Sequence, residues 1–283
     1  MPELPEVEIL VRHLAPLIRS QRIRAVLVNR PKVVGPTPVP EFQRALRGAT
    51  FERVSRRGKY LLFTFCPRRR SGRRVLVGHL GMAGRMYLLP ATAPLPKHTA
   101  VVLELGRNRF VFEDTRYFGR LTLDTGGVDR LGPEPISDGF TQGNFARALA
   151  RSGQAIKVRL LDQSLVAGIG NIYASEALFR ARISPRLPAR RLKPEQIRRL
   201  WQAIRATLAE AIRWGSTVAL NYSGAGERDG LFYFGRDPDA PDFYEERLRV
   251  YDRAGQPCRN CGTPIRRLVQ AARSTFYCPK CQV

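Results

Sequence analysis

Two close cysteine pairs near the C-terminal end constrain the fold of this chain more than any other feature. Cys258 and Cys261 are separated by two residues, as are Cys278 and Cys281, and sixteen residues lie between the pairs. Each pair can chelate one metal ion, and four thiolates complete a tetrahedral zinc site with no open coordination position. We therefore expect one structural Zn²⁺ ion per chain, bound by these four cysteines.

A β-hairpin fits the segment between the cysteine pairs. Residues 264–269 and 274–277 have the composition of strands, so we expect two strands there with a turn over 270–273. Arg273 would then be displayed at the tip of the hairpin, where a basic side chain can contact a phosphate or enter a groove. The fifth cysteine, Cys66, stands apart and is expected to be a small buried apolar residue.

The balance of charge points to a polyanionic partner. The 283 residues include 48 Lys and Arg against 24 Asp and Glu, which gives a net charge of +24. Such a field attracts nucleic acid first and an anionic membrane second. The chain has no run of the ~20 apolar residues that cross a membrane and no signal-peptide pattern at its start. Cysteines spaced for a metal rather than for disulfides suit a reducing compartment, so we expect a cytoplasmic protein.

Hydrophobic spacing predicts different structures along the chain. Residues 5–18 repeat apolar side chains at helical spacing. From about 22 to 125 the apolar runs are short and separated by turns, which favours an antiparallel sandwich or barrel. Helical spacing returns after the Gly/Pro-rich stretch 132–139, the expected domain boundary. We expect strands at 25–28, 60–65, 75–77, 86–89, 100–105, 109–112 and 121–123, helices at 145–151, 156–162, 171–182 and 194–214, a basic loop at 66–74 and a long surface loop at 215–245.

The first six residues could carry chemistry as well as begin a helix. Once Met1 is removed, Pro2 presents a secondary amine next to Glu3, and Glu6 follows three residues later. An α-amino group has a reference pKa near ~7.8, against ~10.4 for lysine, so more of it is unprotonated at neutral pH. A nucleophilic amine beside a carboxylic acid can make and break a Schiff base at a sugar carbon. A helix start, with proline and acids at its positive end, explains the same residues.

Three internal motifs offer further polar groups. Gly168 and Gly170 precede the helix expected at 171–182, where backbone N–H groups could bind a phosphate or form a structural corner. Lys59 follows an Arg-Gly pair and leads into an apolar strand, and it could contact a phosphate or act as an acid–base group. His79 lies between two glycines, and a lone histidine can be structural as well as catalytic.

Taken in order, these motifs resemble those of one family, bacterial formamidopyrimidine-DNA glycosylase, in the superfamily that it shares with endonuclease VIII. The resemblance spans nearly the whole chain. It is carried by Pro2-Glu3-Leu4-Pro5-Glu6-Val7-Glu8, Arg57-Gly58-Lys59-Tyr60, His79-Leu80-Gly81-Met82, Leu131-Gly132-Pro133-Glu134-Pro135, Gly170-Asn171-Ile172-Tyr173-Ala174-Ser175-Glu176 and Arg273-Ser274-Thr275-Phe276-Tyr277-Cys278.

The resemblance implies an α+β protein with three domains. An N-terminal antiparallel β-sandwich with a leading helix would cover 1–131, and a helical domain with a helix–two-turn–helix would cover 132–245, including the loop at 215–245. A four-cysteine zinc-finger β-hairpin would cover 246–283. A monomer of this kind would act in the bacterial cytoplasm on double-stranded DNA that contains oxidised bases or abasic sites. The damaged base would be flipped out, because its C1′ atom is unreachable inside a duplex.

The same resemblance implies catalytic roles. Pro2, freed of Met1, would attack C1′, expel the base and leave an iminium that promotes β-elimination and then δ-elimination. Glu3 would act as acid and base on the opening sugar, and Glu6 is a second family acid. Lys59 resembles the lysine that assists β-elimination, and Arg273 resembles the arginine that grips phosphates and assists δ-elimination. Implied DNA contacts are His79, His98, Lys157 and Asn171, together with Met82, Arg116 and Phe118, which would fill the void left by the flipped base.

Two departures from the family pattern leave the preferred lesion open. Thr115 and Tyr117 stand in Asp114-Thr115-Arg116-Tyr117-Phe118, where the family usually has Pro and Arg. Residues 217–245 do not resemble the loop that usually covers a flipped oxidised guanine. The leading interpretation is a glycosylase and AP lyase acting on the oxidised purines formamidopyrimidine and 8-oxoguanine, and the alternative is an endonuclease VIII-like preference for oxidised pyrimidines.

A non-catalytic zinc-ribbon protein that binds damaged DNA is an alternative from another class. It would explain the charge, the cysteines and the glycines. It would not explain an intact Pro2-Glu3 together with Lys59 and Arg273. Retention of Met1 would block the nucleophile and favour this alternative.

Overall fold

The computed structural model describes residues 2–68, 72–214 and 247–283 and divides into two compact units. The first unit comprises Pro2 and Glu6–Asp129, and the second comprises Glu3–Pro5, residues 130–214 and 247–283. The loop predicted at 215–245 lies outside the described residues. None of the helices within the described ranges is both long enough and apolar enough to cross a membrane.

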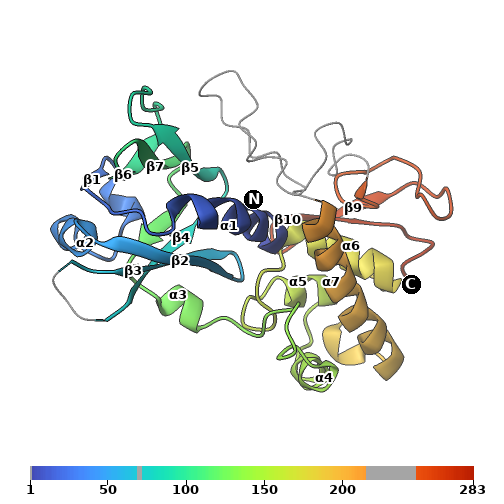
Figure 1. The fold of residues 1–283 in the computed structure, drawn as a ribbon. Coiled ribbons are helices and arrows are strands. Elements are labelled where there is room, and N and C mark those ends of the chain that lie inside the picture. Colours follow the sequence, from blue (N-terminus) through green and yellow to red (C-terminus); the bar gives the residue numbers. More distant parts are fainter. Residues whose placement is uncertain (1, 69–71, 215–246) are drawn as a thin grey trace. The chain divides into compact units, whose positions relative to one another are not determined.

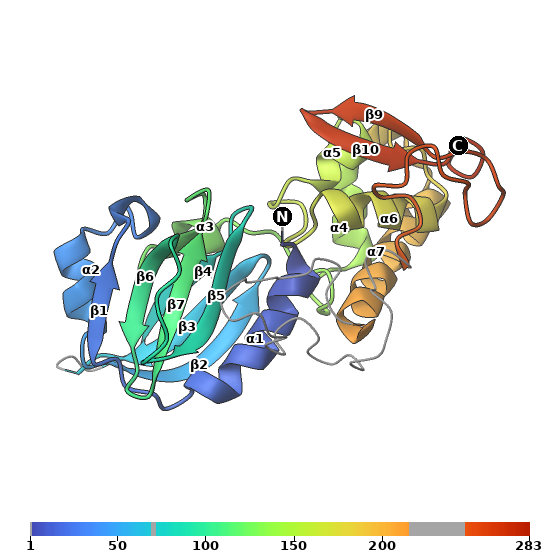
Figure 2. The same ribbon diagram turned by 90° about the horizontal axis from the view of Figure 1, so that it is seen from above.

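Two four-stranded antiparallel sheets form the first unit (Figures 1 and 2). They confirm the predicted β-sandwich with a leading helix, which is α1 (Leu4–Ile18). The first sheet has the order β1 (Ala25–Val28), β6 (Thr99–Glu104), β7 (Asn108–Asp114), β5 (Gly84–Pro90). The second has the order β2 (Thr50–Arg57), β3 (Tyr60–Cys66), β4 (Arg74–His79), β8 (Arg120–Thr122), and the unit also holds α2 (Val39–Leu46), α3 (Gly126–Asp129) and a short 3₁₀ helix, Pro31–Val33.

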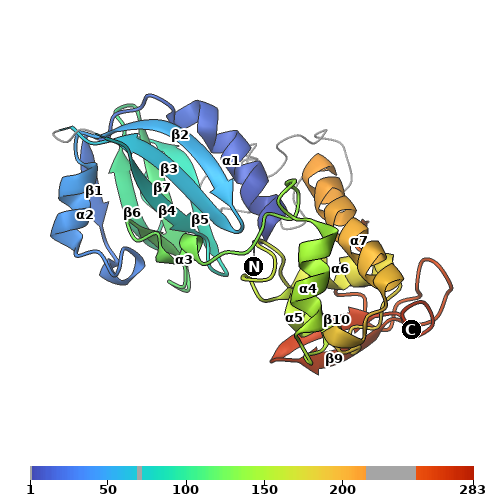
Figure 3. The same ribbon diagram turned by 90° about the horizontal axis from the view of Figure 1, so that it is seen from below.

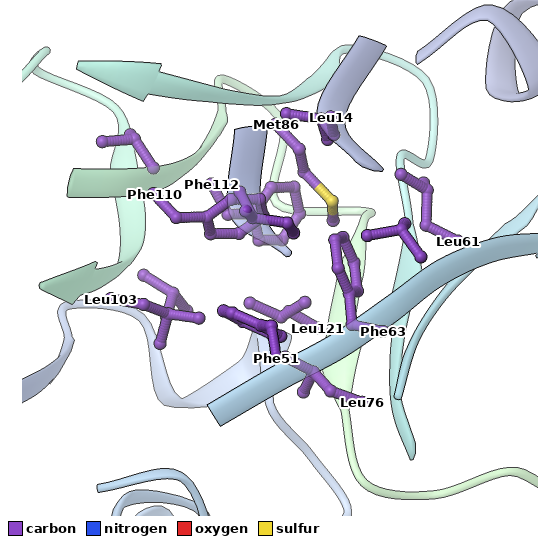
Figure 4. Close-up of a cluster of buried hydrophobic side chains, with 14 of the residues drawn as sticks. Leu14, Phe51, Leu61, Phe63, Leu76, Met86, Leu103, Phe110, Phe112 and Leu121 are labelled. Carbon is purple, nitrogen blue, oxygen red and sulfur yellow. The ribbon is translucent and has the colours of Figure 1, made fainter. Parts of the chain in front are cut away.

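Aromatic and aliphatic side chains from both sheets meet in one core (Figure 4). Alternate residues of β3 are buried, as expected for a strand with one face on the core. Phe63 from β3 and Phe110 from β7 meet edge to face, with ring centroids 5.4 Å apart. Leu14 of α1 joins the same cluster, and each fully buried side chain of this size stabilises the fold by about 2 kcal/mol.

The second unit gathers helices around α6 and carries a two-stranded hairpin (Figure 3). Helices α5 (Ile156–Leu160) and α6 (Asn171–Ala181) are joined by two turns over 161–170, which gives the helix–two-turn–helix. Nine of the eleven residues of α6 are buried, so this helix is the centre of the unit. Its other elements are α4 (Gln142–Ala150), a 3₁₀ helix at Ala189–Arg191, α7 (Pro194–Trp214), β9 (Arg266–Gln270) and β10 (Arg273–Tyr277).

Some local predictions were wrong. Strand β2 and helix α2 were not expected, because β2 has a polar face and α2 begins among prolines. Cys66 is exposed rather than buried, since it ends β3. The hairpin turn contains only Ala271 and Ala272, both with positive φ, so Arg273 is the first residue of β10 and pairs with the last residue of β9.

Candidate active site and metal centre

The carboxylate of Glu3 is held at the N-terminal end of helix α6, within the second unit. It accepts N–H bonds from Gly170 at 2.6 Å, Ile172 at 2.8 Å and Tyr173 at 3.4 Å. These are amide groups of the first helical turn, which have no partner inside the helix and lie at its positive end. Glu3 itself is buried, so its position is determined by these backbone groups.

Two glycines make room for the Glu3 segment. A Cβ atom on Gly170 would lie 2.4 Å from the carboxyl carbon of Glu3. Gly168 has a φ of +85°, and a Cβ there would lie 2.6 Å from the Cδ1 atom of Leu4. The backbone N–H of Leu4 donates to the carbonyl of Gly168 at 3.1 Å. The glycine motif therefore receives Glu3 and Leu4 of this chain, which the sequence analysis had not considered.

The buried Lys157 and the half-buried Asn171 form a polar pair close to Glu3. The Nζ atom of Lys157 donates to Oδ1 of Asn171 at 2.5 Å. Burial lowers the pKa of Lys157 to about 8; the Glu3 carboxylate opposes that decrease, and Arg273 adds to it. A lysine with this pKa can release its proton near neutral pH far more readily than an exposed lysine.

Asn171 also connects helix α6 to the hairpin that carries Arg273. Its Nδ2 atom donates to the carbonyl of Ser274 at 2.8 Å, which fixes β10 against the start of α6. Arg273 is exposed and lies one residue before Ser274. The structure therefore brings Glu3, Lys157, Asn171 and Arg273 together in the second unit.

The four C-terminal cysteines form a ready metal centre. Their sulfur atoms all lie within 4.8 Å of one another. Three of the separations are 3.9 Å for Cys258–Cys281, 3.5 Å for Cys261–Cys278 and 3.4 Å for Cys261–Cys281. A tetrahedral Zn–S distance of about 2.3 Å requires S···S separations of about 3.8 Å. The cluster thus fits one four-coordinate Zn²⁺ ion with a structural role.

Glu176 is a site residue that the sequence analysis quoted within a motif but did not interpret. Its carboxylate accepts N–H bonds from residues 249, 250 and 251, each at 2.9 Å. Burial raises the pKa of Glu176, and these three donors oppose the increase. The contact holds the chain leading into the zinc centre against α6. The sequence did contain a signal for this contact, because Glu176 is an acidic residue among the apolar residues of the helix that became α6.

Lys59 and His79 are neighbours at one end of the β-sandwich in the first unit. Lys59 is buried and precedes β3, while His79 ends β4, and the adjacent Tyr60 pairs with His79. The ring of His79 lies 4.8 Å from that of Tyr60. Burial, with Lys59 and Arg120 adding to it, lowers the pKa of His79 to about 4. Nδ1 of this neutral ring accepts the N–H of Gly81 at 3.2 Å.

The side chains predicted to fill a void in DNA are exposed at the same end of the sandwich. Met82 is 46% exposed and Phe118 is 51% exposed, which is unusual for large apolar residues. The guanidinium of Arg116 lies 4.9 Å from the centre of the Phe118 ring. The loop at 80–83, which carries Met82, touches the loop at 115–119, which carries Arg116 and Phe118, because a Cβ on Gly81 would lie 2.8 Å from the carbonyl carbon of Phe118. Planar and apolar groups are thus presented side by side.

Asp114 holds the loop that carries Arg116 and Phe118. Its carboxylate accepts N–H bonds from Arg116 at 2.9 Å and Gly119 at 2.7 Å. Between them Tyr117 has a φ of 53°, and its hydroxyl lies 3.5 Å from Nδ1 of His98. His98 therefore belongs to this end of the sandwich too. Pro2 and the fully buried Glu6 also belong to the first unit.

A β-sandwich, a helix–two-turn–helix and a four-cysteine centre in one strongly basic chain define a class of zinc-containing DNA-binding proteins. Family models match three segments: formamidopyrimidine-DNA glycosylase N-terminal domain at 1–121, formamidopyrimidine-DNA glycosylase H2TH domain at 131–222, and zinc finger found in FPG and IleRS at 255–283. The chain belongs to the formamidopyrimidine-DNA glycosylase family, as the sequence analysis predicted.

Full-length relatives agree with this assignment. The formamidopyrimidine-DNA glycosylase of Desulfitobacterium hafniense is 43% identical over 290 residues, covering 100% of both chains. The crystal structure of the MutM (Fpg) protein from Thermus thermophilus has a TM-score of 0.82 at 40% identity, covering 99% of this chain and 98% of that one. The Lactococcus lactis Fpg in complex with N7-benzyl-Fapy-dG-containing DNA has a TM-score of 0.85 at 32% identity, covering 99% of each chain.

Proposed function

We propose that this protein is a base-excision-repair DNA glycosylase and AP lyase that removes oxidised purines, formamidopyrimidine and 8-oxoguanine, in the bacterial cytoplasm. The observation that carries the proposal is the position of the Glu3 carboxylate. Glu3 follows Pro2 in the sequence, and its carboxylate is held by the amide groups of Gly170 and Ile172. A chain that only binds DNA has no need of a buried, positioned carboxylate beside its terminal amine. The proposed protein has three domains: a catalytic β-sandwich at 1–131, a helical DNA-binding domain at 132–245 and a zinc finger at 246–283.

In the proposed reaction, the secondary amine of Pro2 forms a bond to C1′ while the bond from C1′ to the base breaks. Glu3 accepts the proton that the Pro2 nitrogen loses and delivers it to the ring oxygen O4′ as the C1′–O4′ bond breaks and the iminium forms, while the base leaves with a proton from solvent. Removal of the C2′ proton then expels the 3′ phosphate, and δ-elimination expels the 5′ phosphate. Lys59 would assist the first elimination and Arg273 the second, while Glu6 is a supporting acid.

The remaining residues would bind and orient the DNA. Met82, Arg116 and Phe118 would occupy the emptied stack, which offsets part of the few kcal/mol that flipping costs. Lys157, Asn171, His79 and His98 would contact the backbone near the lesion. His79 is neutral, so it would donate a neutral N–H to a phosphate oxygen rather than act as a cation. The four cysteines would hold zinc, which supplies no step of the reaction and keeps Arg273 in place.

Borohydride trapping tests the proposal. Protein whose intact mass shows loss of Met1 is mixed with duplexes carrying formamidopyrimidine, 8-oxoguanine, thymine glycol or an abasic site, opposite each base. We expect a covalent adduct, fastest with the purine lesions, and its near loss in Pro2→Gly. Pro5→Gly is the matched control, because it removes a nearby proline but keeps the terminal amine. Absence of an adduct from the processed wild-type chain would contradict the lyase, and preference for thymine glycol would favour the pyrimidine alternative.

A further inference from the structure

The β-sandwich has two ends, and those of its residues that are assigned to DNA all lie at one of them. Lys59 lies between β2 and β3, and Tyr60 pairs with His79, which pairs with Arg120 at the start of β8. In the other sheet, β7 ends at Asp114 where β5 begins at Gly84. The connections 80–83 and 115–119, which carry Met82, Arg116 and Phe118, run between the sheets at this end.

A second set of basic residues lies at the opposite end. There Thr50 pairs with Cys66, Arg22 forms a bridge with Thr50, and Ala25 pairs with Glu104. The N–H of Gly48 donates to the carbonyl of Ile23, so these segments are continuous across both sheets. Six of the exposed arginines at this end, here termed the arginine face, are Arg19, Arg22, Arg24, Arg47, Arg68 and Arg107, and a seventh, Arg73, pairs with Glu52.

The arginine face has no internal counter-charge among the described residues. None of its six members forms an ion pair with a described residue. The nearby carboxylates are already engaged: Glu52 pairs with Arg73 at 2.5 Å, and Glu104 pairs with Arg109 at 2.9 Å. Uncompensated like charges on one surface repel one another, so their concentration here favours an external polyanion.

Two members of the face lie against glycines and are not simply extended into solvent. A Cβ on Gly48, where φ is +81°, would lie 2.8 Å from the Cδ atom of Arg68. A Cβ on Gly106, where φ is +111°, would lie 3.2 Å from the Cζ atom of Arg24. A guanidinium that rests on the backbone loses less conformational entropy when it binds a phosphate.

We propose that the arginine face binds a second segment of double-stranded DNA through its phosphates, independently of the end that carries Lys59. Guanidinium groups recognise phosphate oxygens with paired hydrogen bonds, and contacts to phosphates alone carry no sequence preference. A membrane-binding surface needs several apolar side chains among its cations, but of the large hydrophobic residues exposed in the described part of the chain only Leu17 lies within two residues of a member of this face. With both ends occupied, one protein molecule would connect two duplexes.

The test measures the number of duplexes bound and the affinity of the second one. Sedimentation of the full chain with excess short undamaged duplex should give one protein with two duplexes at low salt. A borohydride-trapped complex, whose first site is covalently filled, should bind a labelled undamaged duplex in fluorescence anisotropy. Six phosphate contacts predict that log K for this second duplex falls with log salt at a slope of about −5.

The variant R22Q/R24Q/R47Q/R68Q removes four charges from the face. It should weaken binding of the second duplex at least tenfold and reduce its salt slope by about 3 to 4, while the rate of trapping at saturating DNA stays unchanged. The matched control is R151Q/R190Q/R191Q/K193Q, four exposed cations of the second unit, which should retain the second duplex.

Three outcomes would overturn the proposal. The first is a stoichiometry of one duplex per wild-type chain. The second is an equal loss of the second duplex in R22Q/R24Q/R47Q/R68Q and in the control variant. The third is displacement of the second duplex by polyglutamate, together with a salt slope that is unchanged in R22Q/R24Q/R47Q/R68Q. Failure of trapping bears on the proposed reaction and not on this surface, because sedimentation counts duplexes without any covalent step.

Discussion

Replacing Gly170 by alanine should slow the reaction by displacing Glu3, with no change in any ionisable group. The new Cβ would lie 2.4 Å from the Glu3 carboxyl carbon. Carbon atoms in contact are separated by about 3.5–4.0 Å, so the carboxyl group must move by roughly 1 Å or more. Gly170 and Ile172 donate to this carboxylate at 2.6 and 2.8 Å, and a movement of that size breaks or bends both bonds.

The size of the effect follows from these two contacts. A hydrogen bond to a charged group contributes about 1.5–3 kcal/mol, and overpacking a dense interior costs about 1–3 kcal/mol. We therefore expect the free energy of unfolding of Gly170→Ala to fall by about 2–4 kcal/mol. Misplacement of a catalytic group by about 1 Å can cost about 100-fold in rate, so we expect a decrease of that order in single-turnover trapping.

The assay is single-turnover borohydride trapping on an abasic-site duplex at saturating DNA, below the melting temperature of the variant. Gly139→Ala is the matched control, because a Cβ on Gly139 meets no atom closer than 3.6 Å. Gly139→Ala should trap at the wild-type rate. DNA affinity of Gly170→Ala should stay within about threefold of wild type, since the substitution removes no phosphate contact.

A double variant separates an effect through Glu3 from a general distortion. If Gly170→Ala acts by moving Glu3, then adding it to Glu3→Gln should lower the rate little further, because contacting residues are not additive. A wild-type rate in folded Gly170→Ala, or a full 100-fold loss in the Glu3→Gln background, would refute the reasoning.

Three more outcomes follow from the structure. Chelating the zinc, or Cys278→Ser, should unfold the hairpin and abolish binding of an abasic-site duplex at the site assigned to Arg273, so that only the duplex on the arginine face stays bound, while circular dichroism shows the β-sandwich still folded; two bound duplexes after verified metal loss would contradict this. The pKa of His79 is lowered from 6.5 to about 4 in the folded protein, so between these pH values the unfolded chain binds a proton that the folded protein does not. The free energy of unfolding should therefore fall by up to about 3 kcal/mol as the pH decreases from 6.5 to 4. In urea unfolding, the His79→Gln variant should not show this decrease at low pH. The same pH dependence in the variant and the wild type would contradict the role given to His79. Arg273→Gln should raise the pKa of Lys157 above about 8, measured by NMR of its Nζ signals, and a lower value would oppose the assigned coupling.

The sequence predicted most elements of the sandwich because their periodicity is clear. Strand β3 alternates cleanly, and its bounds at Tyr60–Cys66 extend the expected strand by one residue. Strand β2 was missed because Arg53 and Arg56 interrupt its apolar pattern. Its register with β3 is decided by tertiary pairing, which includes a shift between Phe51 and Arg53 that no local propensity specifies.

The hairpin shows a different limit of sequence reasoning. Two consecutive residues with positive φ form a tight turn that usually selects glycine or asparagine, so Ala271-Ala272 gave no signal for it. The zinc centre and the ladder from Arg266 to Tyr277 impose this turn despite the cost of left-handed alanine. A four-residue turn was the locally reasonable prediction, and it was wrong for a tertiary reason.

The candidate site shows why residue types could be predicted while contacts could not. Glu3 and the glycines at 168 and 170 belong to separate motifs in the sequence, and nothing in their spacing indicates that they meet. The structure joins them because the Glu3 carboxylate lies so close to the first amide groups of α6 that there is no room for a Cβ on Gly170. Phosphate binding had been one of the two uses considered for this glycine motif, and a structural corner was the other. Since Glu3 already occupies those amides, an incoming phosphate must find its donors elsewhere, on side chains such as Arg273.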